Sequence, residues 1–211
     1  MKTSLTYNQL AGRKIERTEA IIDGVCAISL TLLVLDIKVP VGEAYQSEKD
    51  LLLALFTLGP KFLSYFLSFM TIGIFWTSLS VSNSLIGQSD RHLSWLALFA
   101  LLFVSMLPFT TAFLSEHFHF RTSILLYWLN LSLFGVAMAF HWNYAYTHGY
   151  LKTEVNDKRA VYLALMNRGI IAQSLYVFGA LLCFVSNYLS IAFIIGVQLY
   201  FALAIGFKPK K

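Results

Sequence analysis

GIIAQSLYVFGALLCFVSNYLSIAFIIGVQLYFALAIGF, residues 169–207, decides the fold class, because these 39 consecutive residues contain no Asp, Glu, Lys or Arg. A single helix of that length would span roughly 58 Å at about 1.5 Å per residue, whereas the hydrocarbon core of a bilayer is about 30 Å thick. Ser186-Asn187, near the middle of the stretch, is a turn signal. The stretch therefore predicts two membrane helices joined by a tight loop.

The rest of the chain has the same character. Hydrophobic residues make up 57% of the sequence and charged residues 13%, against about 25% charged residues in soluble domains. No polar stretch is long enough for a soluble domain, so residues 1–211 are expected to form one transmembrane unit. The polar N-terminus predicts no cleaved signal peptide. Cys26 and Cys183 lie in apolar segments and are expected to be buried free thiols.

Six apolar segments predict an all-α, polytopic membrane protein. The expected spans are residues 18–39, 52–82, 93–115, 122–147, 160–185 and 188–207. The second segment carries Lys61 beside Pro60, which predicts that it begins as a surface helix before it enters the bilayer. We find no internal repeat, so a central pathway would require copies of the chain to assemble around it.

The distribution of positive charge predicts the orientation. With six spans both termini lie on one side, and the N-terminal side would hold eleven Lys and Arg residues: Lys2, Arg13, Lys14, Arg17, Arg91, Lys152, Lys158, Arg159, Lys208, Lys210 and Lys211. The other side would hold three: Lys38, Lys49 and Arg121. Both termini are therefore expected to be cytoplasmic. This topology also explains the net charge of +5, so no nucleic-acid partner is expected.

The first span carries an apolar stripe. Ile28, Leu32 and Leu35 recur at helical spacing, and Thr31 lies on the same face. One interpretation is an ordinary helix-packing seam. The other is that the stripe faces its own copies and lines a narrow pore, where an apolar constriction gates by dewetting and a threonine oxygen coordinates a partly dehydrated cation.

Carboxylates in the first span need partners, because charge at membrane depth is costly. Arg17 and Asp23 are six residues apart and do not share a helical face, so each should find a partner on another helix. Trp76 is one candidate. Asp36, at the outer end, has two interpretations: a pore-mouth carboxylate that concentrates cations, or a headgroup-layer carboxylate paired with Lys38.

Several of these segments resemble the transmembrane protein 175 family, a potassium channel family whose animal members lie in endosomes and lysosomes. The resemblance covers residues 13–145 and fades in the last two spans. It rests on Arg17, on Asp23-Gly24, on residues 31–37 (TLLVLDI) with Pro40, on residues 73–76 (GIFW) and on residues 107–112 (LPFTTA).

The resemblance implies a homotetrameric, bacterial cation channel without a pore loop, in which the first helices line the path. It implies that Ile28 is the apolar gate and filter, that Thr31 supports potassium preference, and that Leu32 and Leu35 continue the lining. The chain departs from the family at Ile21-Ile22, where the family has Phe-Ser, and at residues 77–80 (TSLS), where bacterial members often carry a His-His pair. The network formed by Arg17, Asp23 and Trp76 is therefore expected to be altered.

The expected function is a potassium-selective or potassium-preferring channel in a bacterial plasma membrane, with potassium as the permeant ion, no cofactor and no catalytic residues. A secondary transporter is the alternative, although Pro108 is expected to break the third span and the last three spans show no matching break. An accessory membrane protein without transport is a third possibility. A metal site at Glu116, His117 and His119 is left open.

Overall fold

The computed structural model describes residues 15–40 and 47–203, and these residues form a bundle of long helices. The helices follow one another as α2 (Ile15–Leu33), α3 (Glu48–Thr57), α4 (Gly59–Ser84), α5 (Arg91–Glu116), α6 (Arg121–Thr147), α7 (Lys158–Leu181) and α8 (Asn187–Ala202). Two short 3-10 turns, η1 (Val34–Asp36) and η2 (Leu182–Phe184), extend α2 and α7. Within the described ranges the β structure is one isolated bridge, Ile86 to Leu151.

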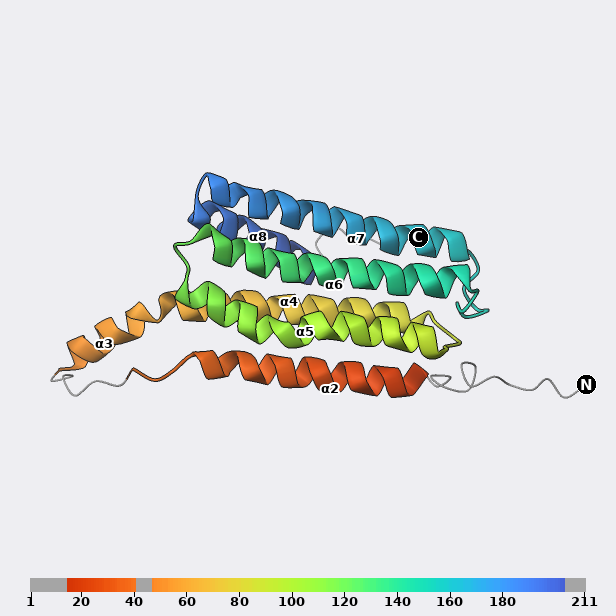
Figure 1. Cartoon of the computed structure of the whole chain (residues 1–211), viewed down its shortest axis with the longest axis horizontal. Coiled ribbons are helices and arrows are strands. Elements are labelled where there is room, and N and C mark those ends of the chain that lie inside the picture. Colours follow the sequence, from red (N-terminus) through yellow and green to blue (C-terminus); the bar gives the residue numbers. More distant parts are fainter. Residues whose placement is uncertain (1–14, 41–46, 204–211) are drawn as a thin grey trace, which may run out of the picture.

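The arrangement is layered (Figure 1). Helices α4 and α5 lie between α2 on one side and α6, α7 and α8 on the other, and α3 projects away from the bundle beyond the start of α4. Five helices, with the 3-10 extensions of two of them, are long and apolar enough to span a bilayer, and α8 is a shorter apolar helix of 16 residues. The chain is therefore a multi-pass, all-helical membrane protein, as the sequence predicts.

Two details differ from the sequence-based spans. The second segment is divided at Leu58 into α3 and α4, with Pro60 in the first turn of α4, where its missing N–H costs no helical hydrogen bond. The expected surface start of this segment therefore corresponds to a separate helix. The expected break at Pro108 is wrong, because α5 continues through that residue.

Side chains at the helix ends explain where the helices begin. The Asp90 carboxylate accepts a hydrogen bond from the Leu93 N–H at 2.8 Å and caps α5, and Asp157 caps α7 in the same way. The turn predicted at Ser186-Asn187 is confirmed, because α8 begins at Asn187. Both cysteines are buried free thiols, as expected.

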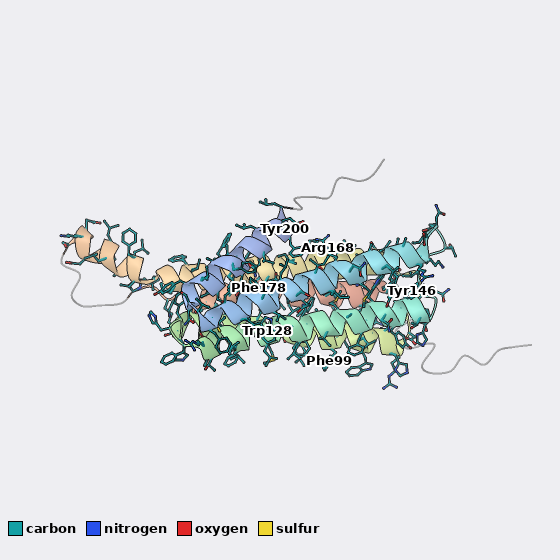
Figure 2. All side chains as sticks on the ribbon, turned by 90° about the horizontal axis from the view of Figure 1, so that it is seen from above. Phe99, Trp128, Tyr146, Arg168, Phe178 and Tyr200 are labelled. Carbon is teal, nitrogen blue, oxygen red and sulfur yellow. The ribbon has the colours of Figure 1, made fainter. Side chains whose placement is uncertain are left out.

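Small residues allow the later helices to pack closely. A Cβ atom at Gly135 of α6 would collide with the side-chain amide of Gln173 on α7, and one at Gly179 would lie 3.0 Å from Ile194 on α8. Small residues are common at such contacts, since association within a membrane depends on close packing rather than on hydrophobic burial. The outside of the bundle is apolar in turn, with Phe99, Phe178 and Tyr200 on its surface (Figure 2).

Candidate functional site

Helix α2 has two distinct faces. Five residues, spaced three or four apart, are buried against the bundle: Thr18, Ile22, Cys26, Ser29 and Leu33. The opposite face, continued by η1, holds Ile28, Leu32 and Leu35, with 60, 44 and 67% of their surface exposed in the single chain. Because α2 packs on α4 and α5 with the first face only, the apolar stripe predicted from the sequence points away from its own protomer.

Thr31 is an exposed residue of α2, as are Ile28 and Leu32. Its hydroxyl donates a hydrogen bond to the carbonyl oxygen of Ile28 at 2.8 Å. The proton is thus directed back along the helix, and the lone pairs of the hydroxyl oxygen remain available as acceptors. A hydroxyl oxygen with available lone pairs therefore lies three residues, or roughly 4.5 Å along the helix axis, from the Ile28 position.

The structure brings Asp23 and Trp76 together. The indole N–H of Trp76, on α4, donates to an Asp23 carboxylate oxygen at 2.7 Å. Both side chains are exposed in the protomer. Arg17 is exposed as well, and within residues 15–40 and 47–203 its side chain has no hydrogen-bond or ion-pair partner. The expected three-residue network is therefore present only as the Asp23–Trp76 pair inside one protomer.

Asp36 is anchored by a residue that the sequence analysis did not identify. The hydroxyl of Ser115, near the end of α5, donates to an Asp36 carboxylate oxygen at 2.8 Å. A salt bridge between Lys61 and Glu116, 2.6 Å long, lies at the same end of the bundle. Lys38 forms no salt bridge with Asp36 among the described residues. The η1 turn that follows α2 therefore carries a positioned carboxylate near the Lys61–Glu116 ion pair.

The metal site left open by the sequence is not assembled. Within the described part of the chain, no group of three or more His, Cys, Asp or Glu residues is arranged to hold a metal ion. Glu116 is instead engaged with Lys61.

A buried polar network inside the protomer was also missed. It consists of hydroxyl and amide groups from four helices: Ser68 and Thr71 of α4, Thr111 of α5, Tyr127 of α6 and Gln198 of α8. Each of these side chains is at most 2% exposed. The signal that could have identified it is the helical spacing of polar residues along α4, although spacing alone does not reveal partners on other helices.

Comparison with known proteins gives consistent results along the chain. The family model for the endosomal/lysosomal potassium channel TMEM175 matches residues 17–108. A potassium channel from Chamaesiphon minutus is 30% identical over 190 residues, which cover 89% of this chain and 93% of that protein. The endosomal/lysosomal proton channel TMEM175 of Gallus gallus is 41% identical over 111 residues, 48% of this chain but 21% of its own length.

A solved structure extends the similarity to the whole bundle. The crystal structure of a lysosomal potassium-selective channel TMEM175 homolog from Chamaesiphon minutus superposes with a TM-score of 0.78 at 28% identity. The match covers 90% of this chain and 97% of the other. The three helices that form or support the stripe, α2, α4 and most of α5, fall within the region matched by the family model.

Proposed function

This chain belongs to the TMEM175 family of ion channels, and from that premise we propose that it forms a potassium-selective, or potassium-preferring, cation channel whose path runs between copies of α2. The family is one of channels and not of enzymes. The observation that carries the proposal is the exposure of Ile28, Thr31, Leu32 and Leu35 on the face of α2 opposite the bundle.

The geometry of such a path requires several copies of the chain. One α2 stripe covers only one side of a pore, and the interior of the protomer is filled by packed side chains. Copies related by rotation present the same stripe to a common axis. We propose a homotetramer, in agreement with the family resemblance. Native mass spectrometry in detergent tests this, and a monomer or dimer as the only species would contradict it.

At the axis, Ile28 is proposed as the narrowest point. A ring of isoleucine side chains excludes water, so the closed path needs no charged plug. A cation that crosses the ring must lose much of its hydration, and this penalises sodium more than potassium because sodium holds water more tightly. Thr31, whose oxygen retains its lone pairs, offsets part of that cost. Leu32 and Leu35 continue the apolar lining toward the outer end.

Two carboxylates are given different roles. Asp36 is proposed as a pore-mouth charge that raises the local cation concentration, with Ser115 holding one of its oxygens. Asp23, with Trp76 and Arg17, is proposed as a structural network. Because Asp23 and Trp76 are both exposed in the protomer, and Arg17 is exposed on the same helix as Asp23, this network is proposed to continue into the neighbouring copy.

The proposed setting is a bacterial plasma membrane with both termini in the cytoplasm. The positive-charge distribution of the loops supports this orientation. The partners are the lipid bilayer and further copies of the chain, the permeant ion is potassium, and no cofactor or nucleic acid takes part.

A secondary transporter is the second candidate, and the buried network around Tyr127 is the observation that favours it. Transporters bind their substrates near the bilayer midplane between helices. Here, however, the hydroxyls of Ser68, Thr71 and Thr111 hydrogen-bond to one another or to Tyr127, which favours a packing role. Recording from purified protein in a planar bilayer separates the two functions: unitary potassium currents support the channel, and flux without them supports the transporter.

A further inference from the structure

Asp90 joins two loops at the end of the bundle where α5 begins. Its carboxylate accepts hydrogen bonds from the Leu93 N–H at 2.8 Å, the Tyr144 hydroxyl at 2.8 Å and the Tyr150 hydroxyl at 3.2 Å. Leu93 belongs to α5, Tyr144 to α6, and Tyr150 to the loop between α6 and α7. A carboxylate held by three donors from three segments has a defined position and not merely a capping role.

The protonation states keep this arrangement intact at neutral pH. Burial acts to raise the pKa of Asp90, but the hydrogen bonds from Leu93, Tyr144 and Tyr150, together with the nearby charge of His92, lower it from its ordinary value. Burial and the nearby Asp90 charge raise the pKa of Tyr150 above 10.0, so that its hydroxyl remains a donor. Acceptor and donor are therefore matched throughout the physiological range.

Backbone contacts connect the same two loops. The Gly87 N–H donates to the Tyr150 carbonyl at 2.8 Å, and the Lys152 N–H donates to the Leu85 carbonyl at 3.0 Å. A Cβ atom at position 87 would lie 3.0 Å from the Lys152 side chain. The α6–α7 loop is thus fixed to the α4–α5 loop by backbone hydrogen bonds as well as through the Asp90 carboxylate.

The first turn of α5 connects Asp90 to α2. The Ser94 hydroxyl donates to the Asp90 carbonyl at 3.0 Å, and its oxygen lies 3.5 Å from the hydroxyl of Thr18. The Thr18–Ser94 contact is at the outer limit of hydrogen-bond distance, and either hydroxyl can be its donor. Thr18 belongs to the buried face of α2, which packs along α5.

From these contacts we propose that Asp90 is a positioning residue for α2: the α6–α7 loop determines, through Asp90 and Ser94, where the N-terminal half of α2 lies. The proposal rests on the proposed function, since the position of α2 matters for conduction only if α2 lines the path. It links α6 and the α6–α7 loop to the ion path, although neither contributes a residue to the stripe.

The test is hydrogen–deuterium exchange of residues 15–26 in the assembled protein, recorded together with potassium current. Asp90→Asn weakens three hydrogen bonds, and Tyr150→Phe removes one and is the milder variant should Asp90→Asn fold poorly. Tyr162→Phe is the matched control, because its hydroxyl donates to Asn143 at 2.9 Å at the same end of the bundle, outside these contacts. Thr18→Val removes the last contact with α2.

We expect exchange in residues 15–26 to rise about tenfold in Asp90→Asn, which weakens three hydrogen bonds, and about threefold in Tyr150→Phe, which removes one. Tyr162→Phe should leave it unchanged. The effect of Asp90→Asn should be much smaller in the Thr18→Val background. Faster exchange confined to residues 85–95 and 144–152 would overturn the proposal and reduce Asp90 to a local cap.

The current separates this proposal from the one it rests on. Altered open probability together with faster exchange in α2 supports both. Faster exchange in α2 with unchanged potassium current supports the positioning role of Asp90 and contradicts the assignment of the path to α2.

Discussion

The hydrogen bond from Trp76 to Asp23 offers the sharpest test of the proposed structural network. It joins α4 to α2, its N···O distance is 2.7 Å, and its acceptor is a carboxylate within a predicted span. Hydrogen bonds to charged groups contribute about 1.5–3 kcal/mol to stability. Both side chains are exposed in the single protomer, so the lower end of that range applies to the protomer and the upper end to an assembly that covers them.

Three variants isolate this bond. Trp76→Phe removes the donor and keeps an aromatic ring, Asp23→Asn removes the charge and keeps the shape, and the double variant completes the cycle. With about 2–4 °C per kcal/mol for a chain of this size, each single variant should lower the melting temperature of the assembly by roughly 3–12 °C. The expected coupling free energy between the two sites is about 1.5 kcal/mol or more.

The assay is thermal unfolding of the purified assembly, with Trp95→Phe as the control, since Trp95 lies exposed on α5. A coupling free energy below about 0.5 kcal/mol, within the scatter of independent sites, would refute the reasoning. So would an Asp23→Asn variant with wild-type melting temperature and wild-type current.

Three further predictions follow from other parts of the molecule. Asp36→Asn should reduce potassium conductance in about 0.01 M salt and have little effect in about 1 M salt, because the Debye length falls from about 30 Å to about 3 Å. Glu116→Gln is the control, since Lys61 already neutralises the charge of Glu116. Equal effects of the two substitutions would contradict a pore-mouth role for Asp36. Gly179→Ala should destabilise the protein by about 1–3 kcal/mol, because its Cβ atom would lie 3.0 Å from side-chain atoms of both Phe193 and Ile194. Gly196→Ala, with open space around it, should not, and equal melting temperatures would dismiss this packing argument. The folded-state pKa of Asp90 is lowered, so its contribution to stability is present at higher pH and lost as pH falls through that pKa. The difference in melting temperature between wild type and Asp90→Asn should therefore be constant from about pH 5 to 8 and shrink below about pH 4. A difference that disappears near pH 6 would be inconsistent with a lowered pKa of Asp90.

The helices and the stripe could be predicted because each depends on local sequence alone. Bilayer thickness sets the length of an apolar segment, and the spacing of Ile28, Leu32 and Leu35 sets the face on which they lie. The structure adds which face packs against the bundle, and this depends on the whole of α4 and α5. The sequence of α2 alone does not show that its buried face is the one formed by Thr18, Ile22, Cys26, Ser29 and Leu33.

The sequence could not supply the hydrogen-bond partners that side chains find on other helices. The sequence offers Trp76 as a candidate partner for Asp23, but nothing near Asp36 points to Ser115, which lies 79 positions away. The buried contacts of Tyr127 were missed for the same reason, since they depend on helix register and rotation. The division between α3 and α4 was foreseen only as a change of environment at Pro60, because a proline in a first turn is compatible with a continuing helix as well as with a new one.

The central claim is that the exposed stripe of α2 lines the ion path, and reversal potentials under bi-ionic potassium and sodium conditions test it most directly. Ile28→Asn should wet the constriction, raise the current and reduce the preference for potassium. Thr31→Val keeps the side-chain shape and removes the hydroxyl, so it should reduce that preference without raising the current. Wild-type reversal potentials in both variants would contradict the claim and indicate that the stripe is an ordinary helix-packing seam.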